Sequence, residues 1–345
     1  MLINDVISHF LQEAGCQVIT NIGYPDFEGK TNLIRAHFQS YLNDAIQIFR
    51  NDMLVIGGGN LVLDVSGVGS RWAIHHFWLS LLARLFSRHY SYLSIGAAPL
   101  QTRLARFLYR FTLRHARRIS ARDSFTKTYL EQLTGRRDIE LLADPVVFIS
   151  AVYPRNRPLP KHSHTIGICP VQLYPVICND FEIYQKYIDL NVKLIHYFLD
   201  CGKNVCLFLN DRRYDREVFQ HIANRIPPER TGFTMRENLA DPQEYLRLVH
   251  ELDFLIASRM HAAITATSYG IPCIGYGWQP KMEFFFRDQG LQGYIDLLDR
   301  FQNGASAENV FTDTIHHYEE LKDKPVVLRS KAFPVREFLG LARAA

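Results

Sequence analysis

The segment LIASRMHAAITATSYGIPCIGYG, residues 255–277, places an arginine and a histidine at the end of an apolar run. The guanidinium of Arg259 matches the geometry of a carboxylate or phosphate, and His261 can exchange a proton near neutral pH. The small residues that follow predict a helix, which Gly270 and Pro272 would end. Because a helix N-terminus attracts anions, we predict an anion-binding site here. The alternative is that Arg259 pairs with a nearby acid and that His261 is an interior histidine.

Three other cationic side chains follow predicted strands, namely Arg122, Arg212 and Lys281. Each could face a bound anion, and Lys281 could reach the same anion as Arg259. The alternative for the first is a helix start capped by Asp123 and Ser124, with Ser124 as a candidate N-cap. For the other two it is a solvated side chain on the surface.

A glycine turn follows the apolar strand in the segment DMLVIGGGNLVLD. Gly57, Gly58 and Gly59 allow a ligand or another segment to approach the backbone closely, and Asn60 adds a polar group. The spacing is not the GxGxxG dinucleotide-binding pattern, and a tight turn is the alternative interpretation. The six cysteines are scattered, without CxxC or metal-ligand spacing. The sequence therefore predicts no disulfide framework, no metal site and no cofactor.

Predicted strands and helices alternate on both sides of a proline-rich segment at 151–164. We expect strands near 17–20, 165–169, 204–209 and 253–257, and helices near 183–199, 215–225 and from Pro242 onward with Asp241 as N-cap. This alternation predicts an α/β protein of two Rossmann-like doubly wound domains. The expected N-terminal domain is 1–150, the C-terminal domain is 165–330, and a tail at 331–345 packs back. In such sheets ligands bind beyond the carboxyl ends of the strands.

Positive charge is concentrated in one part of the chain. Residues 65–122 hold ten arginines and no acidic residue, although the whole chain carries a net charge of only +4. Five of them recur at helical spacing beside an apolar stripe, namely Arg103, Arg106, Arg110, Arg114 and Arg117. An anionic membrane fits this pattern better than nucleic acid, because no aromatic side chains are interleaved with the arginines. The alternative is the solvated face of an ordinary helix.

The location of the protein follows from the same sequence. No apolar stretch is long enough to predict a transmembrane helix, and the first residues lack the basic region of a signal peptide. We expect a cytoplasmic protein with peripheral contact to the inner face of the cell membrane.

Taken together, the motifs resemble those of the polysaccharide pyruvyl transferase family over most of the chain. The most specific block comprises Arg259-Met260-His261, Gly270, Pro272, Lys281, Phe285 and Gly290-Leu291. The weaker pieces are Gly57-Gly58-Gly59 through Asp64, Gly96 through Pro99-Leu100, Arg122-Asp123-Ser124 and Asp144-Pro145.

The resemblance implies a GT-B-like fold, in which two domains face a cleft. It also implies transfer of a pyruvyl group from phosphoenolpyruvate to a sugar, usually as a ketal, with release of phosphate. The donor would contact Arg259, Met260 and His261, with Arg122 as a second donor-binding arginine. A protonated His261 would deliver the proton to the methylene carbon of the donor. The implied acceptor is a nucleotide- or lipid-linked sugar of a surface or cell-wall polysaccharide precursor, bound on the N-terminal side.

Two departures from the family pattern bear on activity. Ser94 and Ala98 stand where the family's second glycine turn usually has glycines. Family members also generally begin with a strand, whereas this chain begins in a predicted helix, so we expect the first strand of the N-terminal domain to be absent. Two alternatives to an active pyruvyl transferase stay open. One is a GT-B glycosyltransferase that uses a nucleotide sugar, and the other is a degenerate, non-catalytic scaffold in polysaccharide assembly.

Overall fold

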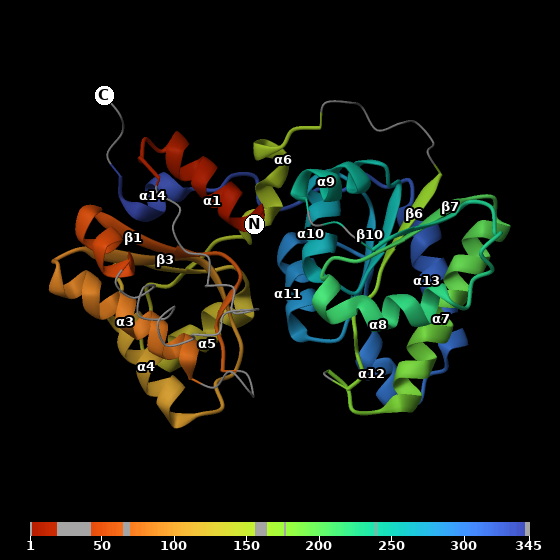
Figure 1. Cartoon of the computed structure of the whole chain (residues 1–345), viewed down its shortest axis with the longest axis horizontal. Coiled ribbons are helices and arrows are strands. Elements are labelled where there is room, and N and C mark those ends of the chain that lie inside the picture. Colours follow the sequence, from red (N-terminus) through yellow and green to blue (C-terminus); the bar gives the residue numbers. More distant parts are fainter. Residues whose placement is uncertain are drawn as a thin grey trace. The chain divides into compact units, whose positions relative to one another are not determined.

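The computed structural model describes residues 2–18, 43–64, 70–155, 164–175, 177–237, 239 and 241–341. The chain forms two compact units (Figure 1). Unit 1 comprises Met1–Pro145 and Ala332–Ala345, and unit 2 comprises Val146–Lys331. The boundary therefore lies earlier than the predicted segment at 151–164, of which 156–163 lie outside the described residues.

Contacts with distant parts of unit 2 explain why the chain joins this unit before residue 151. Helix α6 (Ile149–Val152) packs against α10 (Met260–Ser268). Just after it, the hydroxyl of Tyr269 donates to the carbonyl of Tyr153 at 2.7 Å, and Arg155 donates to the carbonyl of His250.

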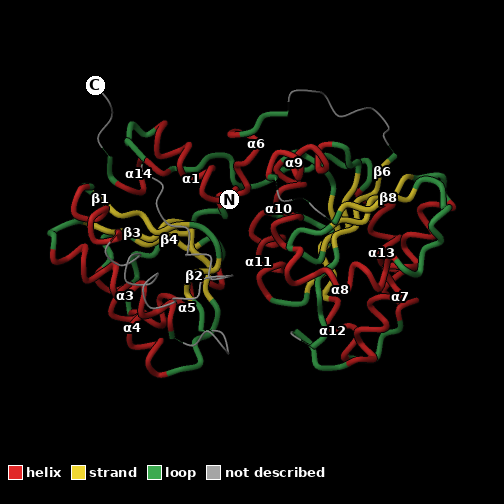
Figure 2. The backbone as a smooth tube through the Cα atoms, viewed as in Figure 1, coloured by secondary structure: helices red, strands yellow, loops and turns green. Residues whose placement is uncertain are grey.

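Unit 1 is built on a parallel sheet in the order β1-β3-β4-β5, with β2 paired to β3 (Figure 2). Helices α3, α4 and α5 cover one face of this sheet, and α1 and α14 lie on the other (Figure 1). The strands are β1 (Met53–Gly57), β2 (Asn60–Val62), β3 (His89–Ala97), β4 (Ile119–Ala121) and β5 (Glu140–Leu141). The helices are α1 (Leu2–Glu13), α3 (Arg71–Leu85), α4 (Arg103–His115), α5 (Ser124–Thr134) and α14 (Val335–Leu339).

The two ends of the chain meet in unit 1. The rings of Phe10 and Phe333 lie 5.5 Å apart in an edge-to-face contact, and Arg336 donates to the carbonyl of Glu13 at 3.3 Å. Apolar contact between α1 and α14 thus places the C-terminal segment on the first unit. Residues 19–20 of the strand predicted at 17–20 lie outside the described residues, and residues 17–18 are not in a strand.

Unit 2 contains a six-stranded parallel sheet in the order β11-β10-β9-β6-β7-β8. Its strands are β6 (Thr165–Cys169), β7 (Asn204–Phe208), β8 (Phe233–Arg236), β9 (Phe254–Ala257), β10 (Cys273–Gly277) and β11 (Tyr294–Asp296). The chain builds the sheet outward from β6, first through β7 and β8 and then from β9 on the other side. The α/β class with parallel sheets is therefore confirmed, and the order reverses between β6 and β9.

The helices of unit 2 follow the strands in the expected alternation. They are α7 (Phe181–Asp200), α8 (Arg212–Ala223), α9 (Pro242–His250), α10, α11 (Pro280–Gln289), α12 (Leu297–Gln302) and α13 (Ala307–Leu321). The predicted cap of α9 is confirmed, since the Asp241 side chain accepts from Gln243 N–H. Helix α8 begins three residues before the predicted Asp215, because Asp211 caps it by accepting from Arg213 N–H.

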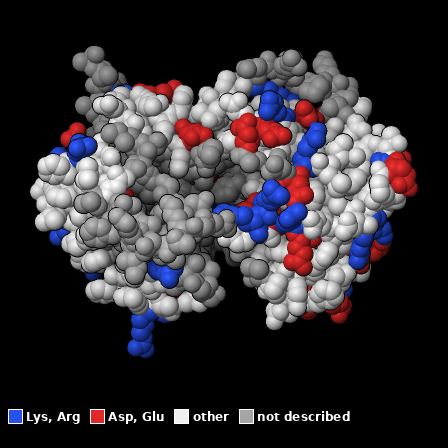
Figure 3. Space-filling model, viewed as in Figure 1, with Lys and Arg blue, Asp and Glu red and all other residues white. Residues whose placement is uncertain are grey.

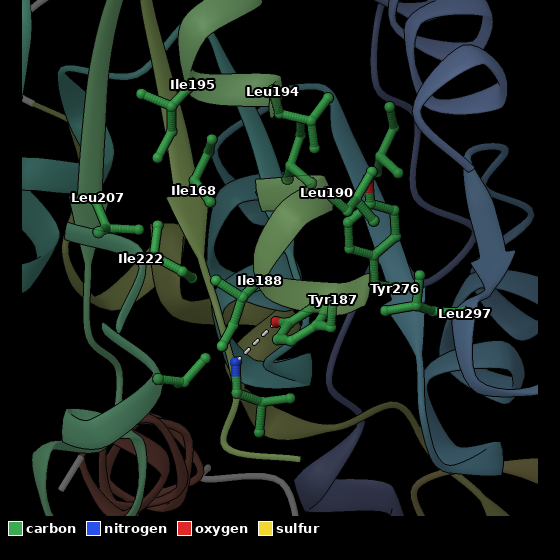
Figure 4. Packing of buried hydrophobic residues seen from close by; sticks show 14 of the residues in the cluster. Ile168, Tyr187, Ile188, Leu190, Leu194, Ile195, Leu207, Ile222, Tyr276 and Leu297 are labelled. Carbon is green, nitrogen blue, oxygen red and sulfur yellow. Dashed lines mark hydrogen bonds between the residues drawn. The ribbon is translucent and has the colours of Figure 1, made fainter. Parts of the chain in front are cut away.

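The core of unit 2 lies between α7 and the sheet. Figure 4 shows Tyr187, Ile188 and Ile195 of α7 beside Ile168 and Leu207 of the central strands. The hydroxyl of Tyr187 accepts a hydrogen bond from Val171 N–H at 3.1 Å (Figure 4). This bond fixes the chain just beyond β6, where the strand order reverses.

Candidate functional site

Arg259 lies at the carboxyl end of β9, next to the point where the strand order of unit 2 reverses. It occupies the N-cap position of α10, and Met260 and His261 are the first two helical residues. Met260 is buried, so it can offer a ligand only its backbone. Gly270 has a φ of +77° just after the helix, as predicted for a glycine that ends it. The crevice at such a reversal is where doubly wound sheets bind ligands.

The guanidinium of Arg259 is held by a carboxylate from another element. Arg259 Nε donates to Asp215 Oδ2 at 2.7 Å, and Nη2 donates to Asp215 Oδ1 at 2.6 Å. The Asp215 side chain is 0% exposed and the Arg259 side chain 20% exposed. Burial alone would lower the pKa of Arg259, but the hydrogen bonds and charge of Asp215 outweigh it and raise that pKa. Arg259 is thus paired with an acid, but this acid lies 44 residues away and is not the local one that the alternative expected.

The pairing leaves one edge of the guanidinium for a ligand. Asp215 occupies the side formed by Nε and Nη2, whereas Nη1 makes no hydrogen bond to the residues that the structure describes. A guanidinium can bind a second carboxylate or phosphate through the edge between Nη1 and Nη2. Arg259 can therefore serve as a fixed cation and still accept an anion.

The loop after β6 completes this arrangement through Gln172. Its backbone N–H donates to Asp215 Oδ1 at 2.9 Å. The side-chain oxygen accepts from Val218 N–H at 2.8 Å, and the amide nitrogen donates to the carbonyl of Tyr174 at 2.6 Å. The buried Gln172 thereby links the end of β6 to α8. Buried polar networks with their hydrogen bonds satisfied are rigid. The hydrogen bonds of Gln172 after β6 and Asp215 after β7 therefore fix the position of Arg259 at the end of β9.

A second set of contacts connects Lys281 to the same strand end. The carbonyl of Ser258 accepts from Trp278 Nε1 at 2.5 Å, and the Ser258 hydroxyl lies 2.7 Å from that of Tyr187. The ammonium of Lys281 lies 4.7 Å from the centre of the Trp278 ring, a cation–π contact. The described contacts thus connect Lys281 to the residue that precedes Arg259.

Arg212 stands at the first position of α8, one turn before Asp215. Its side chain is 53% exposed, and its Nε lies 3.6 Å from Glu237 Oε1. Arg216 shares this acid, at 2.7 Å. Figure 3 shows basic and acidic side chains intermingled on the face of unit 2 in view. Arg212 is therefore an exposed cation that a ligand could recruit from Glu237.

Arg122 belongs to unit 1 and lies just beyond β4. Its buried guanidinium donates from Nη1 to Asp144 Oδ2 at 3.1 Å, and Nε lies 3.5 Å from Asp123 Oδ2. Asp123, and not Ser124, caps α5 by accepting from Thr126 N–H at 2.7 Å. A side chain added at Gly96 would meet the guanidinium at 2.7 Å. The described contacts of Arg122 are therefore those of an arginine that holds together the ends of β3, β4 and β5.

The glycine turn of unit 1 lies beside Arg122, but its glycines make room for α1. A Cβ at Gly58 would lie 1.9 Å from Ile3 Cγ2, and one at Gly57 would lie 2.9 Å from Ile7 Cδ1. Gly58 and Gly59 both have a φ of +75°. The carbonyl of Gly59 accepts from Gly96 N–H at 2.8 Å, and the exposed Asn60 pairs with Gly96 in the sheet.

Ser94 keeps the backbone shape expected of the glycine that it replaces. Its φ is +49°, in the left-handed region that glycine adopts without strain. The N–H of Ser94 donates to the hydroxyl of Ser120 at 2.8 Å. Ser94 therefore has, within β3, a backbone conformation that glycine would adopt without strain.

The structure thus groups the predicted site residues into two sets. Unit 2 brings together Arg259, Met260, His261, Lys281 and Arg212, and unit 1 brings together Arg122, Gly57, Gly58, Gly59 and Asn60. Sequence reasoning missed Asp215 and Gln172. The available signal was weak, since Asp215 is one of several acids near the start of a helix and Gln172 follows a strand without any motif.

Comparison with known proteins agrees with this architecture. The chain is similar in structure to MnaA of S. aureus solved with UDP, at 12% sequence identity and a TM-score of 0.57, over 98% of this chain and 87% of that one. It is also similar to the UDP-GlcNAc 2-epimerase of Methanocaldococcus jannaschii, at 12% identity and a TM-score of 0.53, over 93% and 84% of the two chains. These likenesses show a shared GT-B-like fold. No curated protein matches the sequence.

The family is given by a different comparison. The profile of the polysaccharide pyruvyl transferase family matches residues 1–280. This range includes most of both units and all of the grouped site residues except Lys281, which lies one residue beyond it. The chain therefore belongs to the polysaccharide pyruvyl transferase family.

Proposed function

We propose that this protein transfers the pyruvyl group of phosphoenolpyruvate to two hydroxyls of a sugar, with release of phosphate. The observation that carries the proposal is the arrangement of Arg259, whose guanidinium is fixed by buried Asp215 and keeps its Nη1 edge for an anion. Family membership supports the reaction class. The donor carries a carboxylate and a phosphate, which suit a site with an arginine, a lysine and a helix N-terminus.

The proposed roles follow from the positions of the residues. Arg259 and the first amides of α10 bind an anionic group of the donor, and Lys281 and Arg212 add positive charge. His261, the second residue of α10, protonates the methylene carbon of the donor while a sugar hydroxyl attacks C2 and gives up its proton. A second sugar hydroxyl then attacks C2 as the bond to phosphate breaks. The proton of the first hydroxyl restores His261, and the proton of the second leaves with the phosphate. The cations stabilise the charge that the departing phosphate develops.

Donor binding can be tested without knowing the acceptor. Arg259→Lys keeps the positive charge opposite Asp215 but removes the planar fork, so it should weaken binding of phosphoenolpyruvate by roughly 10- to 100-fold. Arg225→Lys is the matched control, because Arg225 is an exposed arginine of unit 2 that also pairs with an acid, Asp189. Titration calorimetry measures both. Equal donor affinity for Arg259→Lys and Arg225→Lys would remove Arg259 from the site.

The role of His261 requires turnover. With a working sugar acceptor, His261→Gln should lower the rate of phosphate release by roughly 10²- to 10⁴-fold and leave donor affinity nearly unchanged. A parallel fall in donor affinity with no loss of rate would instead assign His261 to binding.

A thermal-shift screen separates this proposal from its alternatives. Stabilisation by phosphoenolpyruvate supports it. Stabilisation by UDP or UDP-sugars alone would favour a nucleotide-sugar enzyme, a class suggested by the likeness to MnaA solved with UDP. Stabilisation by neither donor would favour a non-catalytic scaffold.

A further inference from the structure

The outer side of α3 and α4 in unit 1 exposes large apolar side chains on adjacent helical turns. The exposed fractions range from 42% at Leu81 to 71% at Leu85. The apolar face comprises Ile74, Leu81 and Leu85 of α3 and Leu104 and Phe107 of α4. Such a concentration is unusual on a surface that only meets water.

The two helices join these side chains into one surface. Helices α3 and α4 pack against each other, and the rings of Phe77 and Phe111 lie 5.2 Å apart across the contact. Ile74 and Leu81 lie one turn on either side of Phe77, and Phe107 lies one turn before Phe111. Residues three or four positions apart share a helix face, so the exposed side chains flank a single contact line.

Arginines border this apolar face on α4. Four arginines recur about one turn apart along α4, namely Arg103, Arg106, Arg110 and Arg114, and Arg117 follows the helix. Arg103 and Arg106 directly precede Leu104 and Phe107 of the apolar face. In the described residues none of these five forms an ion pair with a carboxylate, whereas most other arginines near them do. Among the described residues in view, Figure 3 shows basic side chains on the lower part of unit 1, where α3 and α4 lie.

We propose that this face of α3 and α4 docks the protein on a bilayer that contains anionic lipid. The apolar side chains enter the boundary between head groups and acyl chains, while the arginines extend to the lipid phosphates. Nucleic acid would satisfy the arginines but would gain nothing from exposed Leu85 and Phe107. None of the helices in the described part of the chain is long and apolar enough to cross a membrane. The contact is therefore peripheral, and it is independent of the reaction proposed above.

Vesicle flotation with the full chain tests the proposal. The protein should float with vesicles of phosphatidylcholine and about one-third phosphatidylglycerol at low salt, and should be released at about 0.5 M salt. Equal binding to vesicles of phosphatidylcholine alone, or no binding to either vesicle, would overturn it. So would retardation of a DNA duplex without binding to the anionic vesicles, since the partner would then be nucleic acid.

Matched variants locate the surface. Arg110→Gln/Arg114→Gln should lower the partition coefficient roughly 30-fold. Arg225→Gln/Arg230→Gln removes the same charge from unit 2 and should have little effect. Phe107→Ser should lower it about tenfold, whereas Val327→Ser, at a similarly exposed side chain of unit 2, should not. Equal partitioning of each variant and its control would place the contact elsewhere. None of the six substituted side chains is buried, so thermal unfolding should confirm that all four variants are folded.

Discussion

The buried pair of Arg259 and Asp215 should be one of the strongest single interactions in unit 2. Two unit charges about 4 Å apart attract by about 4 kcal/mol at the effective dielectric of a protein site. Arg259→Gln leaves the fully buried Asp215 without its counter-charge, so it should lower the free energy of unfolding by about 4 kcal/mol. Asp215→Asn should cost about 3 kcal/mol, because the Arg259 side chain is 20% exposed and part of its charge meets water.

The double variant is the more discriminating measurement. Once both charges are removed, neither is left uncompensated, so Asp215→Asn/Arg259→Gln should cost about 2–3 kcal/mol less than the sum of the single variants. Asp189→Asn is the control, because the ion pair of Asp189 with Arg225 is exposed, and its removal should cost about 0.5 kcal/mol or less. Additive single effects, or an Asp215→Asn cost no larger than that of Asp189→Asn, would refute the reasoning.

Urea unfolding of unit 2 can be followed separately from unit 1. The chain has three tryptophans, of which Trp72 and Trp78 lie in unit 1 and Trp278 in unit 2. A background of Trp72→Phe/Trp78→Phe makes Trp278 the single reporter, and its indole is hydrogen-bonded next to Arg259. A local reporter is needed because two units need not unfold in one transition.

Three further predictions concern unit 1. Burial, together with the charge of His75, lowers the pKa of His76 to about 3. As the pH falls below about 6.5, this histidine takes up a proton in the unfolded chain but not in the folded one, so its contribution to the free energy of unfolding should fall by about 1.4 kcal/mol per pH unit down to pH 3. His76→Gln should remove this contribution when unfolding is measured across that pH range. Gly58→Ala should cost about 3 kcal/mol in chemical unfolding, because its Cβ would overlap Ile3 at a positive φ; a cost no greater than that of Gly270→Ala, where φ is also positive but the space is open, would contradict this. Ser94→Gly should raise the free energy of unfolding by up to about 1 kcal/mol, and with it the melting temperature, because it relieves a serine in the left-handed region. A lower melting temperature would show that the serine side chain stabilises β3 by more than the backbone strain costs.

Local patterns predicted the architecture well, because caps and apolar periods act over a few residues. Strand β6 spans the predicted 165–169, and Asp241 caps α9 as expected. The start of α8 was predicted three residues late, because Asp211 and Asp215 are both plausible first-turn acids and only the folded chain shows which one caps.

The sequence by itself determined the class of fold, the position of Arg259 and His261 at a strand's carboxyl end, and the arginine stripe on α4. Tertiary structure alone decided what these residues meet. It paired Arg259 with an acid 44 residues away, gave Arg122 two carboxylates inside unit 1, and left the α4 arginines beside exposed apolar side chains. The physical reason is that periodicity and capping are local, whereas counter-charges and burial are set by segments that only folding brings together.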